Sequence, residues 1–201
     1  MKNIITIVVL IILFSLSIGL YQFFKYKPDY SYIVENEPVQ ENIIYEIESF
    51  EKDDFVIIPL KNYEIEARIL SKKKYTIGED SDFATYDLAL GWKEMSDIHY
   101  LEKIKISQRN RWYYWRTKDR SIPREIISYN SSNHHIVHAN EKIKKQLSNL
   151  KEHQVIKMTG YLINAKNINY PNIELKSSLT RKDTGAGACE VFYVDYLEVI
   201  N

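Results

Sequence analysis

Hydrophobic residues form one continuous run at the start of the chain and short alternating runs after it. Residues 4–24, "IITIVVLIILFSLSIGLYQFF", contain no charge and no proline. At 1.5 Å per helical residue, such a run spans about 30 Å, the thickness of the hydrocarbon core of a bilayer. The apolar region of a cleaved signal peptide, the alternative, is shorter, at about 7–15 residues. Residues 1–27, which end in the basic flank of Lys25 and Lys27, are therefore predicted to be an uncleaved transmembrane helix.

The segment that follows predicts a spacer. Residues 28–52 contain two prolines, scattered acids and little periodicity, which is typical of a stalk of limited order. Lysines flank the apolar run on both sides, so the charge bias that sets membrane orientation is nearly balanced. A short basic tail before the first apolar segment usually stays inside. We therefore expect a single-pass protein of the cell membrane whose residues 28–201 lie outside the cytoplasm.

Beyond residue 52, the pattern changes to short apolar or alternating runs. In "YEIEARIL", Tyr63, Ile65 and Ala67 fall on one face of a strand and charged residues fall on the other. The runs that predict strands are residues 55–60, 63–70, 104–108, 154–165, 173–179 and 188–200. The run at 154–165 has Gly160 at its middle, which is typical of a β-bulge or a barrel corner.

One helix is well marked. In "ANEKIKKQLSNLKEH", Asn140 is a good N-cap and Glu141 suits the positive end of a helix. One apolar stripe follows, made by Ile143, Leu147 and Leu150. A second, shorter apolar helix or turn is predicted at residues 88–95, "LALGWKEM".

These elements predict an α+β, strand-rich domain over residues 53–201. A small twisted or partly closed antiparallel sheet with one or two helices fits the order of runs. An OB-like barrel is one compatible arrangement, because a strand with a central glycine follows the helix. Function does not follow from a likeness of this kind.

The charge balance disfavours a general nucleic-acid binder. Residues 1–27 hold three lysines and no acid, and without them the chain has 24 bases against 27 acids, a net charge of about −3. Sequence-independent affinity for nucleic acid comes from an excess of lysine and arginine. A nucleic-acid partner is therefore not expected.

The stretch "RNRWYYWRTKDR", residues 109–120, places four consecutive aromatic residues among basic ones. In a strand, alternation would separate them into two sets: Arg111, Tyr113 and Trp115 on one face, and Trp112, Tyr114 and Arg116 on the other. A single-stranded nucleic-acid platform and a glycan-binding surface both use flat aromatic rings beside cations. The interpretation we favour is a central strand that is packed on both sides. The candidate binding residues are Arg111, Trp112, Tyr114, Trp115 and Arg116, together with Asp183 in the glycine loop near Cys189.

A second candidate site surrounds the single cysteine. "KDTGAGACE" combines Asp183 with a glycine loop that leads into a strand near Cys189. A thiol nucleophile needs a neighbouring base or positive charge. His135 or His138 is the candidate base, with Asp183 or Asn133 to orient it. A buried, structural Cys189 is the interpretation we favour.

Metal chemistry is not expected. His134 and His138 would lie about 13 Å apart along a strand, which is too far for one ion, and no carboxylate-bearing motif such as HExxH accompanies them. The glycine loop lacks the Gly-Lys-Ser/Thr of a P-loop. No cofactor is therefore predicted.

Three stretches, "DLALGW", "ISQ" with "RWYYW", and "SSLTRKDTGAGACE", resemble uncharacterised bacterial proteins that carry an N-terminal membrane segment. The resemblance covers most of residues 55–195. It implies a bacterial envelope protein and carries no assigned activity.

The leading expectation is thus a membrane-anchored envelope protein with a non-catalytic binding or accessory domain. Its partners would be the membrane and another envelope protein or a cell-wall glycan. The alternatives are an envelope hydrolase or transferase that uses Cys189 and a histidine, and a nucleic-acid-binding barrel.

Overall fold

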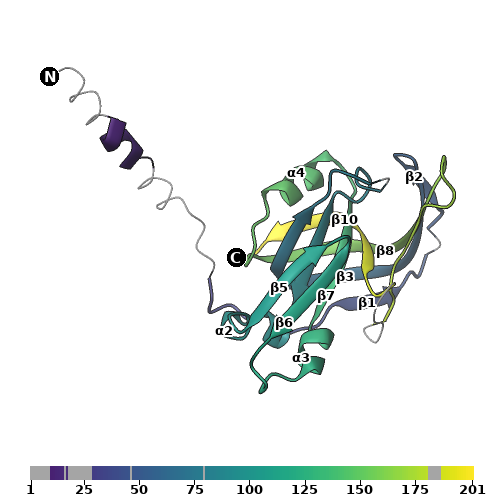
Figure 1. Cartoon of the computed structure of the whole chain (residues 1–201). Coiled ribbons are helices and arrows are strands. Elements are labelled where there is room, and N and C mark those ends of the chain that lie inside the picture. Colours follow the sequence, from purple (N-terminus) through teal and green to yellow (C-terminus); the bar gives the residue numbers. More distant parts are fainter. Residues whose placement is uncertain (1–9, 16, 18–28, 46, 79, 181–186) are drawn as a thin grey trace.

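The computed structural model describes residues 10–15, 17, 29–45, 47–78, 80–180 and 187–201. The strands are β1 (Val39–Asn42), β2 (Phe50–Lys52), β3 (Phe55–Lys74), β4 (Tyr86–Gly91), β5 (Ile104–Arg109), β6 (Trp112–Thr117), β7 (Ser131–His138), β8 (Val155–Asn167), β9 (Glu174–Lys176) and β10 (Glu190–Val199). The helices are the 3-10 helix η1 (Lys93–Ser96) and the α-helices α2 (Ile98–Leu101), α3 (Arg124–Tyr129) and α4 (Glu141–Asn149). The strand-rich α+β class with few helices is confirmed (Figure 1).

The main sheet is mixed, so the prediction of an antiparallel sheet is wrong. Its strand order is β1-β3-β4-β7-β10-β8-β9. β3 also pairs with β8, so the pairings lead from β3 through β4, β7, β10 and β8 back to β3. β7 and β10 run parallel, whereas the other pairs in this sheet are antiparallel. Alternation along a strand reveals which side chains share a face, but it does not reveal the neighbouring strand.

The N-terminal helical residues give no test of the predicted anchor. Residues 10–15 are helical. In the part of the chain that the structure describes, no helix is long and apolar enough to span a bilayer. Most of the predicted segment 4–24 lies outside the described residues, so the transmembrane helix stays a prediction.

The segment predicted to be a stalk contributes to the folded domain. β1 and β2 both pair with β3, and Val34 is buried, with its amide donating to Ser96 Oγ at 2.8 Å. The buried guanidinium of Arg68 donates to the carbonyls of Ser96 and Tyr32 at 2.6 and 2.5 Å. These bonds hold the segment before β1 against the sheet.

Most of the local predictions for the core are confirmed. α4 begins after Asn140, whose side chain accepts from Ile143 N at 3.1 Å, and its stripe is buried in the largest apolar cluster. β4 replaces the first part of the helix or turn predicted at residues 88–95, and all six of its residues are buried. A strand that is covered on both faces loses the alternation that would have marked it.

β5 and β6 form a separate two-stranded sheet, which corrects the interpretation of β6 as a central strand. The inner face of the pair packs on an apolar cluster through Ile104, Ile106, Tyr113 and Trp115. Tyr113 also hydrogen-bonds Ser131 Oγ on β7 at 3.0 Å, and burial raises the pKa of this phenol to about 12. On the outer face, Trp112 and Tyr114 are 40% and 43% exposed, so the expectation that they are core residues is wrong.

The turn of this hairpin also corrects the placement of Arg111. Arg109 pairs with Trp112, so Asn110 and Arg111 form a two-residue loop, and their φ angles are +54° and +65°. Left-handed conformations at both central residues are those of a type I′ turn, which matches the twist of the two strands. Arg111 therefore projects from a turn instead of sharing a strand face with Tyr113.

Gly160 in β8 lies opposite a bulge, as the sequence indicates. It pairs with Val194 where the register of β10 shifts, and its φ is +149°. A Cβ atom at this position would lie 2.0 Å from the carbonyl oxygen of Tyr193. No other residue type fits without moving the backbone of β10.

We expect Gly160→Ala to lower the free energy of unfolding by about 3 kcal/mol, because overpacking adds to backbone strain. Chemical denaturation of the full chain in nonionic detergent measures this loss. Gly187→Ala is the matched control, since Gly187 also has positive φ but a Cβ there meets no atom within 4 Å. Equal losses in both variants would show that the contact with β10 is unimportant.

Candidate active site

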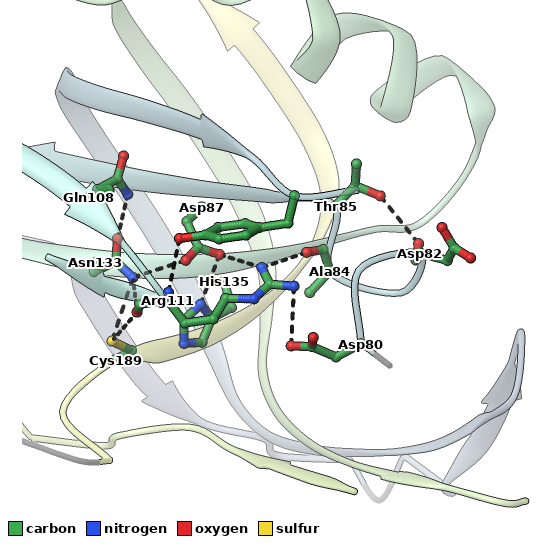
Figure 2. Close-up of polar contacts among 11 residues, drawn as sticks. Asp80, Asp82, Ala84, Thr85, Asp87, Gln108, Arg111, Asn133, His135 and Cys189 are labelled. Carbon is green, nitrogen blue, oxygen red and sulfur yellow. Dashed lines mark hydrogen bonds and ion pairs between the residues drawn. The ribbon is translucent and has the colours of Figure 1, made fainter. Parts of the chain in front are cut away.

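Two strand pairings bring three polar side chains together at one face of the main sheet. Asp87 on β4 and His135 on β7 are directly opposite each other in the antiparallel β4–β7 pair. In the parallel β7–β10 pair, His135 is opposite Val191, two residues after Cys189. Figure 2 shows the side chains of Asp87 and Cys189 beside the imidazole of His135.

The carboxylate of Asp87 is the centre of this group. It is fully buried, and its Oδ1 accepts from His135 Nδ1 at 2.9 Å and from Arg111 Nη1 at 2.8 Å. Asn133 Nδ2 lies 3.5 Å from Oδ2. A buried carboxylate is costly unless it is paired and hydrogen-bonded, and here one cation and one imidazole supply the partners.

The imidazole of His135 is held in its protonated form. Burial alone would lower its pKa, but hydrogen bonds and charges from Asp87 and from Cys189 outweigh burial and raise the pKa from 6.5 to about 10. Nδ1 bonds Asp87, so Nε2 is the ring nitrogen that Asp87 does not occupy. His135 therefore connects an acid on one side with a nucleophile on the other.

Cys189 is half-buried and has polar neighbours besides His135. Asn133 Nδ2 lies 3.5 Å from the sulfur, and the carbonyl oxygen of Arg111 lies 3.9 Å from it. Asn133 is itself fixed, because its Oδ1 accepts from Gln108 Nε2 at 2.6 Å. The interpretation of Cys189 as a buried, structural thiol does not account for its partial exposure or for these polar contacts.

Arg111 joins the hairpin turn to the site. Its Nη1 also donates to the Ala84 carbonyl at 2.7 Å, and its Nη2 lies 3.1 Å from Asp80 Oδ2. The guanidinium stacks on the ring of Tyr75, 4.0 Å from its centroid, and Tyr75 Oη accepts from the Arg111 amide at 2.9 Å. These contacts hold Arg111 in a left-handed backbone conformation, which is strained for a residue other than glycine.

A pocket of about 400 Å³ opens beside this group. Cys189, His135 and Arg111 lie in its wall with Trp112. The remaining described lining residues are Asp80, Ile173, Glu174, Leu175, Lys176, Gly187 and Val191. The thiol thus faces a space that is large enough for part of a substrate.

The other predicted site residues lie elsewhere. His138 is at the end of β7, where burial and the charge of Lys52 lower its pKa. His134 is on the opposite face of β7 from His135, and its imidazole is hydrogen-bonded to Tyr63 Oη at 3.0 Å. Asp183 lies outside the described residues. Arg116 is exposed on the outer face of β6, and Trp115 is on the inner face. The described residues contain no group of acids, histidines and cysteine that could hold a metal ion.

The sequence interpretation missed the role of Asp87. Carboxylates are common, and Asp87 was one of several acids in the same stretch. One signal was present: Asp87 is the one charged residue in the run "YDLALG", which forms a fully buried strand. A lone charge inside a buried strand requires a partner, and partners of this kind gather at functional sites.

Comparison with known protein families, with curated proteins and with solved structures finds no match for this chain.

The raised pKa of His135 predicts how stability depends on pH. The folded-state pKa of about 10 lies above the ordinary value of 6.5, so protonation of His135 stabilises the fold fully below pH 6.5. This stabilisation is lost as the pH rises through about 10. We expect the free energy of unfolding to fall across this window in the native chain and to fall less in His135→Gln. Denaturant titrations at several pH values measure both slopes, and equal slopes would contradict the charged pair.

Proposed function

We propose that this protein is a cysteine-dependent acyl-transfer enzyme, a hydrolase or transferase. The observation that carries the proposal is the hydrogen bond from Asp87 to His135 together with the position of His135 and Cys189 in the wall of one pocket. A nucleophile, a base and a third group that orients the base form the arrangement typical of covalent catalysis on carbonyl compounds. Such enzymes are recognised by geometry and roles rather than by sequence order.

The proposed reaction divides into two steps. The thiolate of Cys189 attacks the carbonyl carbon of an amide, ester or thioester, and the imidazolium of His135 gives its proton to the leaving group as the old bond breaks. The acyl group is then held on Cys189 as a thioester. Water, or the hydroxyl or amine of an acceptor, attacks the carbonyl carbon of this acyl-enzyme. His135 takes the proton from this second nucleophile, and the thiolate leaves. Protons and bonds balance without a cofactor.

The neighbours of the triad have positioning roles in this proposal. A positively charged imidazolium stabilises an adjacent thiolate, and Asp87 keeps the imidazole charged and oriented. Asn133 Nδ2, 3.5 Å from the sulfur, is close enough to donate to the oxygen of a carbonyl bound there. Arg111 fixes the carboxylate from its other side.

A non-catalytic binding domain, the first expectation from the sequence, requires none of these contacts. It remains the competing proposal, and a chemical assay separates the two.

We expect p-nitrophenyl acetate to transfer its acetyl group to Cys189, because the ester has a good leaving group and is small enough for the pocket. Intact-mass spectrometry follows formation of the adduct, and peptide mapping locates it. His135→Gln should slow acylation by about 100-fold, and Asp87→Asn should also slow it, because the imidazole loses the carboxylate that orients and charges it.

His138→Gln is the matched control, since His138 lies away from the thiol, and it should acylate at the native rate. Cys189→Ala should form no adduct. Equal acylation rates in the His135 and His138 variants would favour the non-catalytic domain.

For location, we propose a bacterial envelope protein that is anchored by residues 4–24 with its domain outside the cytoplasm. What supports this proposal is the charge-free apolar run of bilayer length and the short basic tail before it.

Thiol labelling in intact cells tests the orientation. Lys142 is exposed on α4, so Lys142→Cys in a Cys189→Ala background provides one accessible thiol in a chain with no other cysteine. We expect a membrane-impermeant maleimide to label it. Labelling by a permeant reagent alone would place the domain in the cytoplasm.

A further inference from the structure

The outer face of the β5–β6 pair is the most unusual exposed surface among the described residues. Cross-strand pairing places Lys105 opposite Arg116, Ser107 opposite Tyr114, and Arg109 opposite Trp112. All six side chains are exposed, and neither strand contains an acid. Residues 28–201 have a net charge of about −3, so this face is a local concentration of positive charge on an acidic domain.

Among the described residues, the side chains of Lys105, Arg109 and Arg116 form no ion pair. Like charges that are directly opposite on adjacent strands destabilise a sheet, and Lys105 and Arg116 are such a pair. A bound anion would remove this repulsion.

Two aromatic rings lie between these charges on the same face. Trp112 and Tyr114 are two residues apart on β6, which separates them by about 7 Å. Flat rings at this spacing can stack in succession on the faces of planar or ring-shaped units of a polymer. Ser107, opposite Tyr114, adds a hydroxyl for hydrogen bonding.

The face is continuous with the pocket at Cys189, because Trp112 belongs to both. The charged residues of the pocket wall are already paired: Asp80 with Arg111 at 3.1 Å, and Glu174 with Lys176 at 3.0 Å. A polymer with one charge on every unit would gain binding energy from the cations of the face but not from the paired charges of the pocket. A polymer with sparse anions and with rings that present an apolar C–H face suits both.

We propose that the β5–β6 face binds an anionic glycan chain and leads a substituted position of that chain to Cys189. The cations contact carboxylate or phosphate groups, and the two aromatic rings stack on sugar rings. The binding surface stands without the catalytic proposal, whereas delivery of an acyl or peptide substituent to Cys189 rests on it.

Binding of a defined oligosaccharide tests this proposal. The probe is a fluorescent hyaluronan octasaccharide, which has one carboxylate in every disaccharide, and its binding to the full chain in nonionic detergent is followed by fluorescence polarisation. We expect binding that weakens about 10-fold in Lys105→Gln/Arg116→Gln. Trp112→Ala should weaken binding about 10-fold as well.

The double variant Lys142→Gln/Lys145→Gln is the matched control. It also removes two exposed cations, but from α4 instead of the β5–β6 face. In Figure 1, α4 lies at the opposite end of the domain from α3, the helix that follows β6 in the chain. Binding in this control should equal that of the native chain. A neutral chitin hexasaccharide should bind about 10-fold more weakly than hyaluronan, because it lacks the charges.

Three outcomes would overturn the proposal: no binding of hyaluronan, equal weakening in the α4 control, or tighter binding of a thymidine dodecamer or of detergent micelles that contain phosphatidylglycerol through the same residues. Cys189→Ala separates this proposal from the catalytic one, since it abolishes acylation and should leave glycan binding unchanged. Binding without acylation would keep the surface and reject the enzyme, and acylation without binding would do the reverse.

Discussion

The buried carboxylate of Asp87 is the group on which the site and its surroundings depend. A carboxylate without solvent needs partners, and it obtains them from two other segments: His135 on β7 and Arg111 in the β5–β6 turn. The same ion pair therefore fastens the small sheet to the main one. Removal of Asp87 would leave Arg111 and His135 without their shared counter-charge, which is more damaging than the loss of an exposed ion pair.

The parallel pairing of β7 with β10 supplies the rest of the arrangement. β10 lies between β7 and β8, so the residue just before β10 arrives beside His135. Gly160 supports this position from β8, because only a glycine allows the close approach of the Tyr193 carbonyl at the bulge of β10.

Several features lower stability where the molecule could act on a ligand. Arg111 has a left-handed backbone, Asp87 is a buried charge, and Lys105 faces Arg116 across a strand pair. Features of this kind gather at functional sites. Their occurrence around one pocket and its adjoining face is what unites the two proposals.

The sequence by itself determined the local elements. Asn140 and the stripe after it predicted α4, short apolar or alternating runs predicted β3, β5, β8, β9 and β10, and Gly160 predicted the bulge, because capping, period and φ are properties of neighbouring residues. Tertiary structure alone decided that β7 and β10 are parallel, that β6 has an exposed face, and that Asp87 bonds His135 at the pocket that Cys189 lines. Those contacts join residues about 50–100 positions apart, and a side-chain pattern contains no information about which strand becomes the neighbour. His135, one of two candidate bases in the sequence, was therefore singled out by the pairing of strands.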